Sequence, residues 1–355
     1  MSSDLLSAAL SALADAERAL LGGGADRRVF HRQGATLWDP ADDRIATARL
    51  ADRAVRANGR TKEDELVIAL RSSIVRVGKL AAVDRLKVRS YLVVDGEVRS
   101  LKVWSGAAAV KTGGRERDIR ARIEGIEGYR TPPILEHGEV GSTAYLLEPV
   151  VYGRHPASGH QRVEMVADLG AALTRGYVAT TDGDRPLSEV THPEFGTRLQ
   201  EVLADERYPW PDDGGDRDAL RRRAARLIER DLLLPVAITH GDLVASNIIR
   251  DDDARHHLVD WEHGRRGPAA FDLMKLVLTS GDDEAGFEAI RPHLGGLGGR
   301  GWRRYRATHQ LALGLAQTLS WAPGGRERAE RAGRLARYDQ EHLQRLRWLI
   351  RLLNV

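Results

Sequence analysis

The chain has 355 residues, of which 42% are hydrophobic and 30% are charged, and its formal net charge at pH 7 is +3. This composition is typical of a globular protein with room for two lobes, and so small a net charge gives no case for nucleic-acid binding. The absence of cysteine excludes a disulfide framework, a zinc–thiolate site and a thiol nucleophile. We expect a soluble, cytoplasmic protein, because we find neither a signal peptide nor a run of roughly 20 apolar residues that would span a bilayer.

The first seventy residues, 1–70, are predicted to form a helical extension. Apolar residues recur at helical spacing from Leu5 to Leu13, before three consecutive glycines at 22–24. A second helix is expected from Asp43 to Arg56, after the turn signal Asp39-Pro40. No motif in this segment indicates a function.

Residues 71–150 are predicted to form a small lobe rich in strands. Ile74–Val77 and Ser90–Val94 have strand-like compositions. Asp95-Gly96 is typical of a two-residue hairpin turn, and it leads into a further strand, Val98–Trp104.

One helix is predicted within this lobe, from Arg115 to Ile126. The preceding pair Gly113-Gly114 is expected to interrupt the regular structure, and Thr131-Pro132-Pro133 is expected to open a strand region that ends with Ala144–Val151. Strands, a single helix and further strands are the pattern of a small α+β lobe.

Residues 151–355 are predicted to be mostly helical. Helices are expected at 163–177, 216–230, 270–280, 302–321 and 326–352. Two short strands, Asn247–Ile249 and His257–Val259, are expected to flank a turn at 251–253. The predicted fold class is therefore α+β, with a small β-rich lobe, a larger helical lobe and the N-terminal extension.

The most informative motif surrounds these two strands. His240-Gly241-Asp242 is followed by Asn247, and the strand pair returns the chain to Asp260-Trp261-Glu262. Phosphoryl transfer requires a carboxylate near the accepting hydroxyl, a neutral oxygen donor and a second carboxylate that holds magnesium against the phosphates. Protein kinases place these groups at the same spacing, in their H-R-D-x-x-x-x-N and D-F-G motifs.

These residues resemble those of the aminoglycoside phosphotransferase and choline kinase-like family of small-molecule kinases. The match includes Gly267-Pro268 and Asp272-Leu273, extends more thinly back to Ile74 and leaves out the first seventy residues. The resemblance implies a bilobal, protein kinase-like fold, ATP or GTP as phosphate donor, Mg²⁺ as cofactor and a hydroxyl group of a small molecule as acceptor.

Each polar residue of the motif has an expected role. Asp242 would act as the catalytic base, orienting the acceptor hydroxyl and accepting its proton. Asn247 and Asp260 would bind the metal, because amide and carboxylate oxygens are ligands that Mg²⁺ prefers. By the resemblance, Asp272 would be buried and would hold the loop backbone in place. Glu262 is left open between a role near the metal and a solvent-exposed position.

A kinase also needs a cation on the nucleotide phosphates, and Lys102 is predicted to supply it. Lys102 lies between apolar neighbours in the last strand of the predicted hairpin, which is the position of the β3 lysine in kinases. Glu116 is its expected partner, with Glu124 as the alternative. Lys111 is the competing lysine, but it lies next to the predicted glycine break.

The segment after Leu147 is expected to bind the nucleotide base. The backbone carbonyl of Glu148 and the amide of Val150 are the predicted contacts, because the intervening Pro149 has no N–H to donate. The phosphate-covering loop is expected at 78–86, with one glycine where protein kinases have three. Gly296–Gly301 fits a dinucleotide-binding pattern but follows no strand, so we interpret it as a loop.

The acceptor is expected to be a small molecule. Only His263–Gly267 separate Glu262 from Pro268 and the next helix, which leaves no room for the long activation loop of protein kinases. Residues 302–355 contain eleven arginines, no lysine and four acids. If these helices line the acceptor site, a neutral or anionic acceptor fits better than a polycationic aminoglycoside; a solvated helix face is the alternative.

Two other functions stay open, a non-catalytic kinase-like binding module and a protein kinase. A nucleic-acid-binding role for the arginine-rich end has no supporting motif. No membrane partner is expected, and the sequence indicates no oligomeric state.

Overall fold

The computed structural model describes residues 3–21, 28–33, 36–39, 44–46, 86–94, 97–190, 194–206, 208, 214–231, 233–294 and 307–353. Several predictions lie outside these residues: the strand Ile74–Val77, loop residues 78–85, the turn Asp95-Gly96, residues 47–56 of the second N-terminal helix and the Gly296–Gly301 motif.

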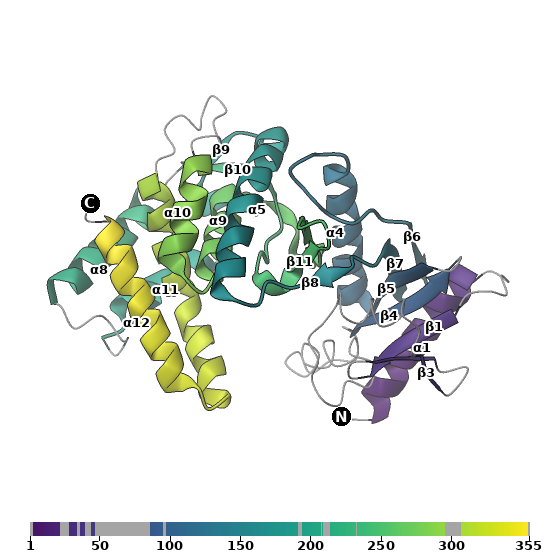
Figure 1. Ribbon diagram of the computed structural model, residues 1–355. Coiled ribbons are helices and arrows are strands. Elements are labelled where there is room, and N and C mark those ends of the chain that lie inside the picture. Colours follow the sequence, from purple (N-terminus) through teal and green to yellow (C-terminus); the bar gives the residue numbers. More distant parts are fainter. Residues whose placement is uncertain are drawn as a thin grey trace. The chain divides into compact units, whose positions relative to one another are not determined.

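The chain forms two compact units (Figure 1). The first comprises Met1–Gly125, Arg130–Pro156 and Ser246–Gly264, and the second comprises Ile126–Tyr129, Ala157–Ala245 and Arg265–Val355. The chain thus leaves the first unit after Pro156 and returns to it at Ser246. The division at residues 70 and 150 remains our proposal for the functional parts of the chain.

A seven-stranded antiparallel sheet forms the centre of the first unit. Its strand order is β3-β2-β1-β4-β5-β7-β6. The strands are β1 Arg28–Gln33, β2 Thr36–Asp39, β3 Arg44–Ala46, β4 Leu86–Val94, β5 Glu97–Ser105, β6 Glu136–Val140 and β7 Thr143–Pro149. Consecutive residues of a strand point to opposite faces, and Leu101, Lys102 and Val103 of β5 are all fully buried. Both faces of the sheet are therefore covered at this strand.

Helix α1, Ser3–Leu21, packs against this sheet and contacts β4, β5, β6 and β7. Its buried residues Ala12, Leu13, Ala16 and Leu20 recur at helical spacing and form one apolar stripe. The predicted N-terminal helix is confirmed, and it contributes to the core of the first unit.

The residues after α1 depart from the predicted helical extension. Strands β1, β2 and β3 add to the β4 side of the sheet, and β3 begins where the second helix was expected to begin. The strands β1 and β2 contain Val29, Phe30, Thr36 and Trp38, and two residues separate β1 from β2. This composition and spacing favour a hairpin over a helix.

Helix α4, Ala107–Ile123, begins well before its predicted start and continues through Gly113-Gly114. The predicted break at this pair is therefore wrong. A Cβ atom on Gly113 would lie 2.7 Å from Cε3 of Trp104 in β5. The glycine allows the helix to approach the sheet closely, so a tertiary contact explains it better than a turn does.

A three-stranded sheet in the first unit carries part of the motif. Its order is β12-β11-β8, with β8 Gly153–Arg154, β11 Ile248–Asp251 and β12 His256–Leu258. β11 and β12 form the predicted antiparallel hairpin, in which Ile248 pairs with Leu258. The short 3₁₀ helices η2, Ala245–Asn247, and η3, Trp261–His263, flank the hairpin.

The second unit is mainly helical, as predicted. Its helices are α5 Gly159–Thr180, α6 Leu187–Val190, α7 Glu194–Ala204, α8 Gly214–Glu229, α9 Ala269–Leu278, α10 Asp283–Leu294, α11 Ala307–Arg331 and α12 Leu335–Leu353. Helix α9 is central, because it contacts α5, α10 and α11 and all but two of its residues are buried. Among the described residues, no helix is both long and apolar enough to span a bilayer.

A small sheet in the second unit was not predicted. Its order is β13-β10-β9, with β9 Asp184–Pro186, β10 Leu233–Thr239 and β13 Arg265–Pro268. β10 is an apolar stretch that is buried after its first residue, and such short runs do not distinguish a strand from a buried helix. β10 ends directly before His240, and β13 leads directly into α9.

Helices α11 and α12 lie side by side (Figure 1), but the break between them falls later than predicted. α11 continues through Pro323-Gly324-Gly325 and ends at Arg331. A Cβ atom on Gly325 would overlap the Tyr338 hydroxyl of α12. As at Gly113, the glycine permits a close contact between elements, and the predicted break is wrong.

His342 makes the stability of this helix pair dependent on pH. Its Nε2 shares a hydrogen bond with the Tyr208 hydroxyl, and its ring stacks on Tyr338 with 5.9 Å between centroids. Burial, together with nearby Arg345, lowers the pKa of His342 from 6.5 to about 4. The folded protein therefore holds a neutral imidazole over a pH range in which the unfolded chain takes up a proton.

We expect acid to weaken the fold through this group. Because the folded pKa lies below the unfolded one, stability is lost as the pH falls from 6.5 towards 4. Between pH 7 and pH 5, wild type should lose roughly 2 kcal/mol more unfolding free energy than His342→Gln. Urea denaturation of both proteins at the two pH values measures the difference, and equal losses would refute it.

Candidate active site

Lys102 lies in β5, and its side chain is fully buried. Its Nζ is 2.6 Å from Glu116 Oε1 of α4, which is the contact expected from the sequence. The alternative residues Lys111 and Glu124 are both exposed. The Lys102–Glu116 pair fixes an ammonium group at one position on the face of the sheet that α4 covers.

Two further charged side chains complete this cluster. Lys102 Nζ is 3.2 Å from Glu148 Oε1, while Arg120 donates to Glu148 Oε2 at 2.5 Å and to Glu116 Oε1 at 3.3 Å. Burial opposes the charge on Arg120, but the two carboxylates outweigh it and raise the pKa of the guanidinium. Sequence reasoning missed Arg120, although its i, i+4 spacing from Glu116 was an available signal.

Glu148 and Val150 were predicted to bind a nucleotide base through their backbones. Glu148 lies in β7 and Val150 follows that strand, and both side chains are buried. The Glu148 carboxylate belongs to the buried ionic cluster, a role that sequence reasoning missed. The backbone contacts with a base stay a prediction.

The β11–β12 hairpin brings the two predicted metal ligands together. Beyond the pair Ile248–Leu258, the amide of Val259 donates to the carbonyl of Asn247 at 2.9 Å. Asn247 therefore lies opposite the residue that precedes Asp260. Asp260 has a left-handed backbone with φ 70° and ψ 57°, which Asp tolerates better than most residues do.

The carboxylates of Asp260 and Glu262 converge on one cation, Lys87 of β4. Lys87 Nζ is 2.5 Å from Asp260 Oδ1 and 3.0 Å from Glu262 Oε2. The Glu262 side chain is only 3% exposed, so the solvent-exposed position left open for it is wrong. Sequence reasoning missed Lys87, because its contact spans 173 residues of sequence.

These residues fit a magnesium ion. Two carboxylate oxygens already converge on a cation, and the Asn247 amide belongs to the same hairpin. No group of three or more His, Asp or Glu side chains in the described ranges is placed to hold a metal. The ligands expected from the sequence are Asn247 and Asp260, and the Glu262 carboxylate shares the Lys87 cation with Asp260.

In the second unit, Asp272 of α9 fixes the loop that carries Asp242. The amides of His240 and Gly241 donate to its two carboxylate oxygens at 2.5 Å and 3.0 Å, and Tyr177 donates to it at 3.2 Å. Burial raises the pKa of Asp272, and the charge and amide of His240 oppose that rise. The structural role expected for Asp272 is confirmed.

Asp242 forms an ion pair with Lys275 of α9, and its side chain is 31% exposed. Lys275 Nζ also lies 5.1 Å from the centroid of the Trp321 ring of α11. Lys275 follows Asp272 by three residues on the same helix, so α9 holds both the loop anchor and a cation for Asp242. Sequence reasoning missed this lysine, because nothing in the motif connects it to Asp242.

A cavity of about 100 Å³ adjoins this ion pair within the second unit. Its lining combines aromatic, polar and charged side chains: Phe195, Phe271, Trp321, Thr239, Gln317, Arg265, Lys275 and Asp272, with Gly241 and Pro268. Its charged side chains are Arg265, Asp272 and Lys275, and Lys275 is paired with Asp242. Larger cavities of about 380 and 750 Å³ lie elsewhere in this unit and include none of the predicted site residues.

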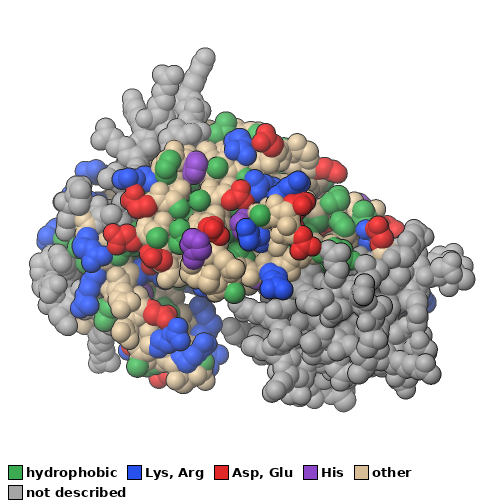
Figure 2. Space-filling model, viewed as in Figure 1, with side chains coloured by type: hydrophobic (Ala, Val, Ile, Leu, Met, Phe, Trp, Pro, Cys, Tyr) green, Lys and Arg blue, Asp and Glu red, His purple; other side chains and the backbone are tan. Residues whose placement is uncertain are grey.

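None of the described arginines of residues 307–353 lines the cavity beside Asp242. Five of the eight arginines described there form ion pairs with acids: Arg326, Arg331, Arg337, Arg345 and Arg351. Figure 2 shows basic and acidic side chains interspersed over the visible surface of this unit. The solvated helix face, the alternative left open for these arginines, fits this arrangement.

The solved structures that are similar to this chain include the following three. A thermostable mutant of aminoglycoside phosphotransferase APH(4)-Ia is 14% identical, with a TM-score of 0.47 over 79% of this chain and 98% of that chain. Choline kinase LicA from Streptococcus pneumoniae is 12% identical, with a TM-score of 0.45 over 79% and 98%. Macrolide 2'-phosphotransferase MphH from Brachybacterium faecium is 17% identical, with a TM-score of 0.47 over 73% and 88%. No curated protein sequence matches the chain.

A family model gives the decisive match. Residues 84–308, more than half of the chain, match the phosphotransferase enzyme family APH. The matched stretch includes Lys102, Asp242, Asn247 and Asp260, and it agrees with the predicted α+β, protein kinase-like fold and with the predicted enzyme class, a small-molecule phosphotransferase. The chain therefore belongs to the phosphotransferase enzyme family.

Proposed function

We propose that the protein transfers the γ-phosphoryl group of ATP or GTP to a hydroxyl group of a small molecule. The arrangement of charged side chains in the first unit carries this proposal. Lys102 is paired with Glu116 in a buried cluster, and the Asp260 and Glu262 carboxylates converge on a cation. A non-catalytic module would be expected to have lost at least one member of this set.

The first unit would hold the nucleotide. Lys102, fixed by Glu116, would bind the phosphate oxygens, and the backbone of Glu148 and Val150 would bind the base. Asn247 and Asp260 would hold Mg²⁺. The ion would supply positive charge to the phosphate oxygens as they gain negative charge in the transition state.

The second unit would hold the acceptor. Asp242 would orient the hydroxyl group and accept its proton as the acceptor oxygen bonds to the γ-phosphorus. The bond from the γ-phosphorus to the bridging oxygen breaks, and the nucleoside diphosphate leaves with that electron pair. Asp272 holds the amides of His240 and Gly241, which keeps the Asp242 loop in position.

The cavity beside Asp242 favours a neutral or anionic acceptor. Lys275 and Arg265 offset the carboxylates of Asp242 and Asp272, so the lining has no excess of acids to attract a polycation. Its Phe271 and Trp321 rings suit the apolar face of a sugar or a similar ring. β13 begins at Arg265, two residues after η3 ends, and leads directly into α9. The chain thus has no activation-loop segment here on which a peptide would dock, which supports a small acceptor.

Replacing Asp260 tests the nucleotide role. We expect wild type to bind ATP or GTP in a magnesium-dependent manner, and Asp260→Ala to weaken that binding by at least about tenfold, because a charge-assisted contact with the metal is lost. Calorimetry with each nucleotide, with and without Mg²⁺, measures the effect. Asp253→Ala, which removes an exposed carboxylate from the β11–β12 turn, is the matched control. If no nucleotide binds under any condition, a non-catalytic module becomes the better hypothesis.

A further inference from the structure

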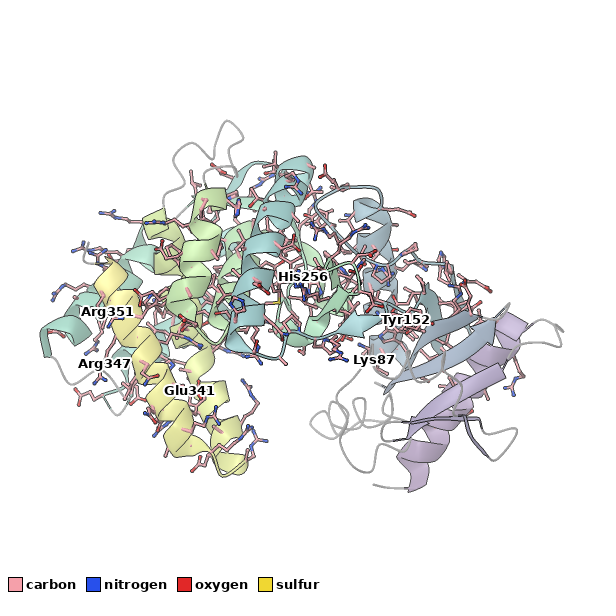
Figure 3. The ribbon with its side chains drawn as sticks, in the orientation of Figure 1. Lys87, Tyr152, His256, Glu341, Arg347 and Arg351 are labelled. Atoms are coloured by element: carbon pink, nitrogen blue, oxygen red, sulfur yellow. The ribbon has the colours of Figure 1, made fainter. Side chains whose placement is uncertain are left out.

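Lys87 holds together two carboxylates that would otherwise repel each other. Its ammonium lies within hydrogen-bond distance of both Asp260 and Glu262, and the three side chains are 14%, 17% and 3% exposed. Figure 3 labels Lys87 in the first unit. A poorly hydrated pair of carboxylates without a cation would be costly, so the ammonium stabilises this arrangement.

The register of the sheet places Lys87 and Lys102 on the same face, although they have different partners. Lys87 of β4 lies opposite Trp104 of β5, and Lys102 is two residues from Trp104. Directly opposed residues share a face, as do residues two apart on one strand, so both lysines lie on the same face. Lys102 is bonded to Glu116 and Glu148, whereas Lys87 neutralises the second pair of carboxylates.

We propose that Lys87 is a displaceable counter-ion of the metal carboxylates, and that its ammonium competes with a divalent cation for Asp260 and Glu262. The inference rests on the proposed function in taking Asp260 as a metal ligand. Magnesium approaches oxygen ligands to roughly 2.0–2.1 Å and demands a regular coordination shell, so an ammonium bonded to the same carboxylate oxygens must move away. A lysine has four rotatable carbon–carbon bonds and leaves without a change in the backbone.

The competition couples metal binding to nucleotide binding. Once displaced from these carboxylates, the Lys87 ammonium can bind another anion, and nucleotide phosphates supply one. Without nucleotide, the metal must break the contacts of Lys87 with Asp260 and Glu262, and no phosphate contact offsets that loss. The metal alone should therefore bind weakly, and metal and nucleotide should each strengthen the binding of the other.

Manganese binding to the full chain without nucleotide tests the proposal, with the electron paramagnetic resonance signal of free Mn²⁺ as the readout. Lys87→Met removes the competing charge, and it should bind Mn²⁺ about tenfold or more tightly than wild type does. Lys111→Met, at an exposed position of α4, should match wild type. The double variant Lys87→Met with Asp260→Asn should lose the gain.

Equal or weaker Mn²⁺ binding by Lys87→Met would overturn the proposal. If that variant does not fold, as judged by circular dichroism, Lys87→Gln is measured in its place, with the same expected gain and the same contrary result. Calorimetry with nucleotide on these proteins separates the Lys87–metal competition from the proposed function. Magnesium-dependent nucleotide binding without any Mn²⁺ gain refutes the competition alone, whereas a Mn²⁺ gain without nucleotide binding refutes the proposed function alone.

Discussion

Asp242→Asn is expected to lower kcat by roughly 10²–10⁴-fold, because the amide cannot accept the proton of the acceptor hydroxyl. Nucleotide affinity should stay close to that of wild type, because the residues proposed to bind the nucleotide and metal belong to the first unit. The loop should also keep its conformation, because Asp272 binds the amides of His240 and Gly241 independently of the Asp242 side chain. The measurement is single-turnover phosphate transfer to an acceptor found by screening neutral and anionic hydroxyl compounds.

The same substitution at an exposed carboxylate, Asp253→Asn, is the control and should leave kcat unchanged. A decrease of less than about tenfold for Asp242→Asn would count against the base role, because it would correspond to less than about 1.4 kcal/mol of transition-state stabilisation. Lys275→Met separates orientation from proton transfer. Lys275 pairs with Asp242, so its loss should lower kcat while the Asp242 carboxylate remains available as a base.

The parts of the site that lie close together in sequence could be predicted. The five-residue step from Asp242 to Asn247 and the strand pair that returns to Asp260 fix the local geometry before any tertiary contact is known. The Lys102–Glu116 pair was also predictable, because a strand lysine followed by a helix constrains its partner to a few positions. In both cases a short connection along the chain keeps the residues close together.

Contacts between distant segments could not be predicted in this way. Lys87 and Asp260 are 173 residues apart in the sequence. Lys275 belongs to α9, and the bonds of Asp272 to the loop amides fix the rotation of that helix. Glu148 illustrates the same limit. Its backbone was predicted to bind a nucleotide base, but its carboxylate contacts Lys102 and Arg120, which come together only in the folded sheet and helix. No local periodicity of the sequence predicts such tertiary contacts.

The glycine pairs led to two wrongly predicted helix breaks, for a related physical reason. Gly113 and Gly325 lie inside helices because a neighbouring aromatic side chain, Trp104 or Tyr338, leaves no space for a Cβ atom. In a single sequence a glycine that permits close packing has the same appearance as a glycine that ends a helix. The aromatic partner of Gly113 lies on the adjacent strand β5, and that of Gly325 lies on the next helix.

Lys102→Met is expected to destabilise the protein by about 3–5 kcal/mol, because it leaves two carboxylates and one guanidinium in a buried cluster. The native cluster balances Lys102 and Arg120 against Glu116 and Glu148, and all four residues are at most 4% exposed. Urea denaturation measures the loss. Lys111→Met, at an exposed position of the adjoining helix, should change the unfolding free energy by less than about 0.5 kcal/mol.

A second substitution distinguishes charge imbalance from lost packing. Adding Glu116→Gln to Lys102→Met restores neutrality, with Arg120 still bonded to Glu148, so the double variant should be more stable than Lys102→Met alone. Such non-additivity is expected only for residues that interact directly. Nucleotide binding should remain lost in both variants, because the phosphate-binding ammonium is absent from each. If stability and nucleotide affinity recovered together, the Lys102 side chain would have no role beyond balancing charge.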